Sequence, residues 1–494
     1  MRGEPILQKW FSPQNKNPHK SKFEKITEKG KKMIINEKII PEVLALAMSG
    51  GADFAEIFAQ RSRTNSINYL GGKIDNISDN VISGVGVRAF LGTKTVYAST
   101  TDISREGLLR CAGSVAAAMG ESKNSGIESI VLTPVTVKDM HTVKTYPSDV
   151  ETKVKADILR SACSAAKEYD SLISQSTGTY LDVDRTILVA NTEGLLVTDR
   201  KIRTRLVVSA VASKDGENQS GSAGPGAGMG MEFFEKISPE ESGKHAARQA
   251  ITNLKADYCP AGQMTVAIEN GFGGVIFHEA CGHSLEATQV GVGMSEMCGK
   301  LGEKIANEKI TAIDDGTIVN GWGSSNIDDE GNPTQRNVLI ENGILKNYMI
   351  DRLGSRRMGM PMTGNSRRQN YGFEPTSRMT NTFIDNGPDK NEDIIASIEY
   401  GLYAKEMGGG SVNPLTGAFN FAVKEGYIVR NGKICEPVRG ASLIGTGSQI
   451  LRDIDMVGQN LATGQGMCGS SSGNVPTDVG QPLIRVGKIT VGGR

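Results

Sequence analysis

The chain has 494 residues, which is long enough for two or more domains that each bury a hydrophobic core. Its 55 Lys and Arg residues balance 55 Asp and Glu residues, so the overall charge gives no reason to expect nucleic-acid binding. No apolar run reaches the roughly 18 residues of a membrane helix, and seven scattered cysteines are not typical of a disulfide framework, so we expect a cytoplasmic protein that does not bind membranes.

The first 32 residues are polar and basic, with nine Lys and Arg residues against three Glu residues. They lack the apolar segment of a secretory signal. A basic tail can contact nucleic acid or a membrane surface, but we expect residues 1–32 to be a disordered extension. Met33 would then be a sensible alternative start.

Residues 34–258 are predicted to form an N-terminal domain with an antiparallel sheet and helices. A periodic apolar stretch predicts a helix over Ile39–Met48, ended by Gly50 and Gly51. Alternating apolar segments separated by Gly or Asn-Asp then predict antiparallel strands. These segments are AEIFAQRS, SINYLGGKIDNISD, GVGVRAFLG and KTVYAST, between Ala55 and Thr100.

Helical patterns return at Arg105–Met119 and Val150–Tyr169. A long hairpin is predicted next, with its turn at the NTEG sequence of residues 191–194. A further helix is expected from about Pro239 to Ala256, and it closes the first half of the chain.

Residues 260–494 are predicted to form a C-terminal β-rich domain that carries the helix of a metal site, which makes the whole fold α+β. A strand is expected at the MTVAIE sequence, which begins at Met264. Two hairpins are expected around the ENG turn of residues 341–343 and the RNG turn of residues 430–432.

The most informative stretch is His278-Glu279-Ala280-Cys281-Gly282-His283, an HExxxH pattern in a chain with five histidines. Two imidazoles can hold a divalent metal, and the carboxylate between them can take a proton from water. Residues i and i+5 lie about 140° apart on a regular helix, so both histidines reach one metal only if the helix is distorted, for example by a π-bulge. We expect Gly282 to tolerate the dihedral angles of such a distortion. The alternative is a core helix whose histidines bond to backbone carbonyls.

A catalytic metal site with two histidines needs a third ligand and an open position. Cys281, Glu286 and a residue distant in sequence are the candidates, although Cys281 is too close to both histidines for a comfortable geometry. Glu286 follows His283 by three positions, so it shares a helix face with it and could either ligate the metal or orient the histidine. The spacing leaves these possibilities open.

Several motifs in the second half accompany the histidine pair. They are DDEG from Asp328, LIENGILKNYMIDR from Leu339, TGNSRR from Thr363, PTSRMTNTFI from Pro375, EMGGGSVNPLTGAFNF from Glu406, VRGASLIGTG from Val438 and MCGSSSGNVPTDVGQPLIRVGKITVGG from Met467. Together with HEACGH they resemble the TldD branch of the TldD/PmbA family of zinc-dependent peptidases. The resemblance is strongest over residues 260–494 and continues more weakly from residue 34.

The resemblance implies that Cys468 completes a site with His278 and His283, holding one zinc ion per catalytic chain. A thiolate with two imidazoles is a known ligand set for catalytic zinc and favours zinc over manganese or iron. In that reading Glu279 is the general base. Other residues in family-like segments could contact the substrate or the oxyanion: Arg367, Arg368, Tyr371 and Arg378.

The family also implies a peptidase for short or unfolded peptides, which an exposed strand edge could capture by β-augmentation. It implies a PmbA/TldE-type partner chain in a heterodimer, and a homodimer is the alternative. Competing hypotheses are a non-catalytic binding or regulatory subunit of such a complex, a regulator of a DNA-linked protein, and a hydrolase with Cys281 as nucleophile.

Overall fold

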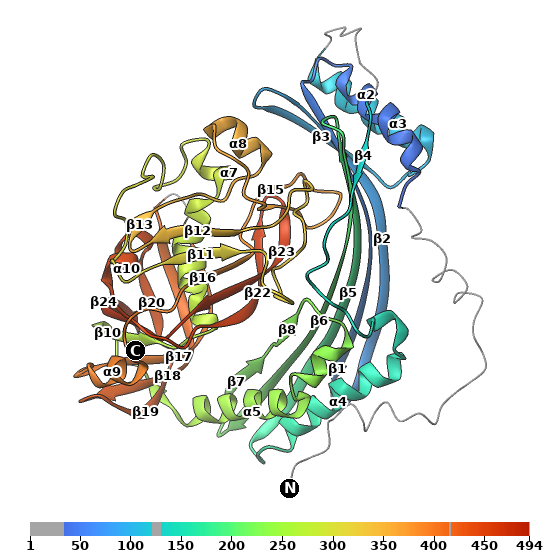
Figure 1. Ribbon diagram of the computed structural model, residues 1–494. Coiled ribbons are helices and arrows are strands. Elements are labelled where there is room, and N and C mark those ends of the chain that lie inside the picture. The colour runs from blue at the N-terminus through green and yellow to red at the C-terminus, as the bar shows by residue number, and fades with distance from the viewer. Residues whose placement is uncertain (1–33, 121–129, 414–415, 494) are drawn as a thin grey trace.

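The computed structural model describes residues 34–120, 130–413 and 416–493 (Figure 1). The expected basic extension, residues 1–32, and the alternative start at Met33 lie outside the described residues. The described chain is α+β, as predicted. A long curved sheet lies beside a compact C-terminal part that contains two further large sheets (Figure 1).

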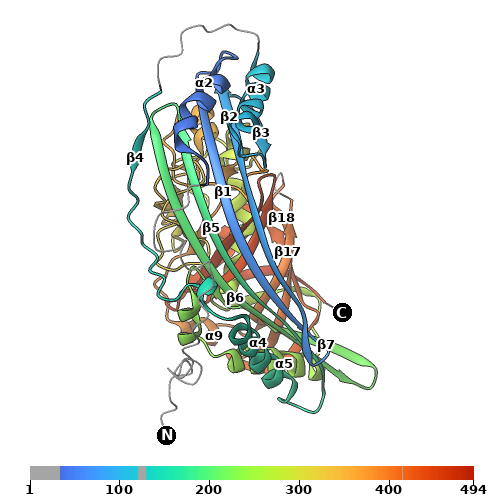
Figure 2. The same ribbon diagram turned by 90° about the vertical axis from the view of Figure 1, so that its right-hand side faces the viewer.

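The curved sheet is built from two long antiparallel hairpins, β1–β2 and β5–β6 (Figure 2). The strand order is β3-β2-β1-β5-β6-β4, and β7 and β8 also pair with β6. The short segments expected from the sequence are merged into longer strands, because β1 bonds to a neighbour on both sides along most of its length. The bounds are β1 Phe54–Leu70, β2 Lys73–Leu91, β3 Lys94–Thr100, β4 Thr133–Val135, β5 Ile173–Asn191, β6 Leu195–Lys214, β7 Glu217–Ala223 and β8 Gly226–Ala227.

Helices cover the two ends of this sheet, with α2 and α3 at one end and α4 and α5 at the other (Figure 2). Each helix predicted from the apolar periodicity is present, with ends within two residues of the expected ones. They are α2 Ile40–Met48, α3 Arg105–Met119, α4 Thr152–Lys167 and α5 Pro239–Lys255. In β1, Ile57 packs into the core under α2 and α3, and Ile67 packs into the core under α4 and α5. Phe58, whose side chain lies on the opposite face, packs against Ile327 of the C-terminal part.

Five strands of the C-terminal part close a ring, because β17 pairs with β10 on one side and with β18 on the other. Three short strands extend it: β9 Asp257–Tyr258, β19 Lys433–Arg439 and β21 Ile454–Val457. The ring strands are β10 Gly262–Ile268, β17 Tyr400–Val412, β18 Ala418–Arg430, β20 Ser442–Thr446 and β24 Ile484–Gly492. Strand β9 falls within residues 34–258, but it pairs with β19 of the C-terminal part. The expected division into residues 34–258 and 260–494 stays a prediction.

The third large sheet has the order β13-β12-β11-β16-β23-β22, so β22 lies at its edge. Its strands are β11 Ala312–Asp315, β12 Arg336–Glu341, β13 Ile344–Leu345, β16 Asn381–Ile384, β22 Ala462–Ser470 and β23 Gly473–Gln481. Both expected hairpin turns are present. Asn342 and Asn431 each have φ 49°, and the glycines that follow them are also in the left-handed region, as a tight two-residue turn requires.

The remaining elements are short. Besides the helical turns of residues 272–285, they are η2 Glu37–Ile39, η3 Pro147–Asp149, η4 Met231–Glu235, α7 Ala287–Val290, α8 Arg352–Met358, β14 Ser366–Arg367, β15 Thr376–Ser377, α9 Asn391–Ala396 and α10 Gly447–Asp453. Within the described ranges, no helix has both the length and the apolar character needed to cross a membrane.

A buried cluster of charges joins the curved sheet to the C-terminal part. Arg88 on β2 forms ion pairs with Glu56 on β1, at 3.0 Å, and with Glu330. Arg368 lies 3.3 Å from the same Glu56, and its backbone N–H donates to Asp329 at 2.8 Å. Burial alone would raise the pKa of Glu56, but Arg88 and Arg368 outweigh it and lower that pKa. The cluster is therefore charged, and within it each arginine faces a carboxylate.

Candidate metal centre

The HEACGH motif follows a glycine turn that brings the chain against the third large sheet. Gly271 has φ 70°, and the next residues form the short helices η5 Phe272–Gly274 and α6 Val275–Phe277. A Cβ atom on Gly274 would lie only 2.3 Å from the carbonyl oxygen of Gly480 on β23. Glycine at this position therefore allows the helix start to pass close to β23, the neighbour of β22.

The helix is distorted where the histidines occur, as the i and i+5 spacing predicts. His278–Gly282 forms a π-helical turn, η6, and a 3₁₀ turn, η7, continues over His283–Leu285. The expected role of Gly282 was wrong, because its φ of −57° and ψ of −47° are ordinary helical values. Close packing is the physical reason for glycine here, since a Cβ atom would lie 2.3 Å from Sδ of Met379.

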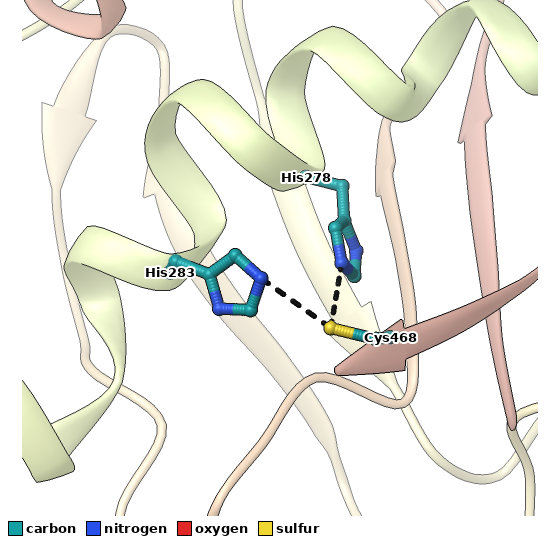
Figure 3. A group of neighbouring side chains, drawn as sticks. All are labelled: His278, His283 and Cys468. Carbon is teal, nitrogen blue, oxygen red and sulfur yellow. Dashed lines mark hydrogen bonds between the residues drawn. The ribbon is translucent and has the colours of Figure 1, made fainter. Parts of the chain in front are cut away.

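The distorted helix and the edge strand β22 bring His278, His283 and Cys468 together (Figure 3). The Nε2 atom of His278 lies 3.1 Å from Sγ of Cys468, and that of His283 lies 3.3 Å from the same sulfur. The three donor atoms all lie within 4.8 Å of one another. Two imidazole nitrogens and one thiolate that converge in this way fit a divalent metal with an affinity for soft ligands.

The charges of the site favour the thiolate form of Cys468. Burial would raise the pKa of its thiol, but the adjacent His278 and His283 lower the pKa to about 3. Burial alone would lower the pKa of His283, but the nearby Glu286 and Cys468 outweigh this effect and raise the pKa of His283. The sulfur therefore carries the negative charge that a metal ligand needs.

The two glutamates of the motif region have different positions. Oε2 of Glu279 lies 3.7 Å from Nε2 of His283, on the side of the ring that faces Cys468, and its side chain is 27% exposed. Glu286 is buried, and its Oε2 lies 3.1 Å from Nδ1 of His283. Of the two roles considered for Glu286, this geometry fits the one that orients the histidine.

The other candidate cysteine does not join this group. Cys281 is fully buried, and its thiol donates to the carbonyl of Gly447 at 3.5 Å. Burial raises the pKa of this thiol well above its usual value, which disfavours the thiolate that a nucleophile requires.

The four residues expected near the substrate are divided between two places. Arg368 and Tyr371 lie at the contact with the curved sheet, where the Tyr371 backbone N–H donates to Gln60 at 3.1 Å. Arg367 and Arg378 lie near the centre, and Arg378 donates to the carbonyl of Cys468 at 2.6 Å. All three arginines are buried with protein partners, so the geometry gives no support to the substrate contacts expected for them.

Two residues of the site were missed in the sequence, namely Ser377 and Met379, which flank the expected Arg378. Oγ of Ser377 accepts from the backbone N–H of Thr288, which follows the motif, and Met379 packs against Gly282. The only signal in the sequence is that these residues belong to the PTSRMTNTFI run. Nothing in the spacing shows that they lie beside a helix almost 100 residues earlier.

Three domain models of one protein family match most of the chain. Residues 261–493 match the PmbA/TldA metallopeptidase C-terminal domain, residues 145–254 the central domain and residues 55–118 domain 1. The chain is 37% identical over 453 residues to a protein of Haemophilus influenzae named metalloprotease TldD homolog, covering 89% of this chain and 93% of that protein. It is 28% identical to a Saccharolobus solfataricus protein named zinc metalloprotease TldD homolog, covering 72% and 76%.

Solved structures share the fold. A Thermotoga maritima protein, whose name proposes a role as a modulator of a DNA gyrase, superposes with a TM-score of 0.75 at 24% identity, covering 92% of this chain and all of that one. TldE from Thermococcus kodakarensis superposes with a TM-score of 0.73 at 18% identity, covering 92% and 99%.

Proposed function

The chain belongs to the PmbA/TldD family of metallopeptidases, and we propose that it is a zinc-dependent peptidase that hydrolyses short or unfolded peptides. The observation that carries this proposal is the convergence of His278, His283 and Cys468 beside the carboxylate of Glu279. A donor set that only held the fold together would not need an acid at its open side.

In this proposal His278, His283 and Cys468 would hold one zinc ion per chain. Zinc bound there would supply Lewis acidity, which activates water at neutral pH and polarises the scissile carbonyl. The two imidazoles with one thiolate favour zinc among the common divalent metals.

Glu279 is the general base and acid of the proposed reaction. Its Oε2 atom is close to the metal-facing nitrogen of His283, and its partial exposure leaves it accessible to water and substrate. It would accept a proton from the attacking water at this oxygen and later donate one to the departing amine. Glu286 accepts from Nδ1–H of His283, which keeps Nε2 of that ring free for the metal.

The substrate and partner proposals follow from the family, and β22, which carries Cys468, lies at the edge of its sheet. We propose that an extended peptide binds by β-augmentation, which tolerates many sequences because main-chain hydrogen bonds supply the affinity. A PmbA/TldE-type chain is the proposed partner in a heterodimer, supported by the shared fold with TldE, and a homodimer is the alternative. The seven cysteines are all free, which supports a reducing compartment such as the cytoplasm.

The second candidate function is a non-catalytic binding or regulatory subunit. In such a subunit nothing would require a partly exposed carboxylate beside the donor atoms, but Oε2 of Glu279 lies 3.7 Å from Nε2 of His283. This observation favours the peptidase.

The test compares wild type with Glu279→Gln on an unstructured peptide and on a folded protein, with zinc measured in each sample. We expect cleavage of the unstructured substrate alone, and a rate at least about 100-fold lower in Glu279→Gln with zinc retained. Glu308→Gln is the matched control, because its side chain is 77% exposed and pairs with the exposed Lys304. A Glu279→Gln variant as active as wild type would overturn the mechanism, and equal cleavage of the folded protein would overturn the substrate class.

A further inference from the structure

We propose that Arg378 is a positioning residue that fixes Cys468 and His283 of the centre relative to each other. This inference rests on the proposed metal site. It assigns Arg378 no contact with substrate, because its side chain is fully buried.

The first observation concerns the strand that carries Cys468. Cys468 lies opposite Val475 in the antiparallel hairpin of β22 and β23, three pairs from the Ser470–Gly473 turn when that pair is counted. Nη2 of Arg378 donates to the Cys468 carbonyl at 2.6 Å. Nη1 donates to Oγ of Ser472 and to the carbonyl of Gly473, both at 2.9 Å, at the turn into β23. The guanidinium thus bonds to both strands of the β22–β23 hairpin beside its turn, and it fixes the backbone that carries the thiolate.

The second observation concerns His283, which Arg378 approaches through Glu286. Nε of Arg378 lies 3.8 Å from Oε1 of Glu286, whose other oxygen bonds to His283. Both side chains are buried, and in the part of the chain that the structure describes, neither Nε of Arg378 nor Oε1 of Glu286 has a hydrogen-bond partner. A buried carboxylate needs a nearby positive charge, and Arg378 supplies it. One planar cation therefore compensates Glu286 and holds the Cys468 backbone at the same time.

The third observation is that the backbone of Arg378 is itself fixed. Its N–H donates to the Asn365 carbonyl at 2.9 Å, and its carbonyl accepts from Nδ2 of Asn365 at 3.0 Å. The same amide donates to the buried Asp314 at 2.7 Å. The neighbouring Ser377 and Met379 contact Thr288 and Gly282 on either side of η7. Arg378 therefore projects from a segment that contacts the motif region on both sides, by a hydrogen bond at Ser377 and by packing at Met379.

Another buried arginine provides a matched control. Arg368 is as buried as Arg378 and also bonds to carboxylate and carbonyl oxygens, but its partners are Glu56, Asp329, Phe373 and the hydroxyl of Tyr97. Within the described ranges, no hydrogen bond or ion pair joins these partners to His278, His283 or Cys468. Arg368→Gln should therefore reduce stability without changing the metal site, whereas Arg378→Gln should change the metal site itself.

The experiment measures zinc affinity by chelator competition, and the absorption spectrum after replacement of zinc by cobalt, in the full-length protein. We expect Arg378→Gln to weaken zinc binding about 10- to 100-fold, which is typical for loss of a residue that orients metal ligands. We also expect it to shift the thiolate-to-cobalt absorption band. Arg378→Lys keeps the charge near Glu286 but not the planar fork, so we expect an intermediate affinity. Arg368→Gln should keep the wild-type affinity and spectrum.

Wild-type affinity and an unchanged cobalt spectrum in Arg378→Gln would overturn the inference, as would an equal loss of affinity in Arg368→Gln. If Arg378→Gln does not fold, Arg378→Lys decides by the same criteria. Failure of the proposed function has a different signature, because the wild-type protein itself would then bind neither zinc nor cobalt, and this result would remove both proposals.

Discussion

Two buried, charge-rich regions of this protein differ in how their charges are balanced. In the cluster that joins the curved sheet to the C-terminal part, Arg88 and Arg368 face Glu56, Glu330 and Asp329 directly. In the candidate metal centre, three donor atoms from His278, His283 and Cys468 lie within 4.8 Å of one another. The first region has its counter-charges within the chain, and the second gathers donors of the kind that a metal ion binds.

The difference shows how a structural ion cluster can be distinguished from a functional one. Burial and charge are common to both regions, so neither property identifies a site. What distinguishes the centre is the convergence of metal-binding atoms on each other, with a partly exposed carboxylate, Glu279, at their open side. We therefore expect substitutions in the cluster to change stability, and substitutions in the centre to change metal affinity and activity.

The largest change in stability should come from Arg88→Met. Removal of this cation leaves Glu56 and Glu330 buried without it, and breaking such a pair costs about 3–5 kcal/mol of the free energy of unfolding. Urea unfolding measures the loss, and zinc content should stay at the wild-type value. Arg63→Met is the control, because its pair with Asp79 is exposed and should contribute less than about 1 kcal/mol. Loss of zinc in Arg88→Met with little change in stability would reverse the distinction between the two regions.

Glu286→Gln should have the opposite signature. The substitution keeps the shape of the side chain but removes the charge that faces Nδ1 of His283, so we expect zinc affinity to fall about 10- to 100-fold. Chelator competition gives the affinity, and Glu241→Gln, on a side chain 69% exposed, is the control. An unchanged affinity would mean that Glu286 has no part in orienting the histidine.

Gly282→Ala tests the packing of the π-turn. Because the added Cβ atom would lie 2.3 Å from Sδ of the fully buried Met379, we expect a loss of about 1–3 kcal/mol in the free energy of unfolding. The loss should be smaller when Gly282→Ala is introduced into a Met379→Ala background, where the space is free. An equal loss in both backgrounds would show that the helix geometry, not the contact, requires glycine.

The smallest expected effect is a pH dependence at the border of the charge cluster. Burial and the nearby Glu330 raise the pKa of Asp351 to about 7. Since this folded-state pKa lies above the unfolded value of about 3.9, the stability from its bound proton is present at acidic pH and is lost as the pH rises through 7.

Asp351→Asn removes this titration and keeps an oxygen for the bond to the backbone N–H of Gly354 at the start of α8. Relative to wild type, the variant should gain on the order of 1 kcal/mol in stability between pH 6 and pH 8. Urea unfolding at both pH values measures it. A constant difference between the two proteins would contradict the assigned pKa.

Local patterns in the sequence predicted much of the fold and part of the site. Helix periodicity gave the four helices of the curved sheet, and the i and i+5 histidine spacing correctly required a distorted helix. Spacing could not choose the third donor, because Cys468 is 190 residues from His278 and meets it only through the pairing of the third large sheet. The resemblance to a known family supplied that residue.

The arginines show a second limit of sequence reasoning. Arg367, Arg368 and Arg378 occur close together in the chain, but Arg368 lies in the charge cluster and Arg378 lies behind the metal centre. A guanidinium can bind substrate, pair with a buried acid or donate to backbone carbonyls, and its neighbours in space determine which role it has. These neighbours come from distant segments, so the sequence pattern could not separate the roles.

The measurement that tests the central claim most directly is the metal content per chain of freshly purified protein, beside His283→Ala and Cys468→Ser. The account predicts about one zinc ion in the wild type, as expected for one three-ligand site, and none in either variant. A wild-type protein without metal after zinc is added under reducing conditions would contradict it, and so would variants that keep their zinc.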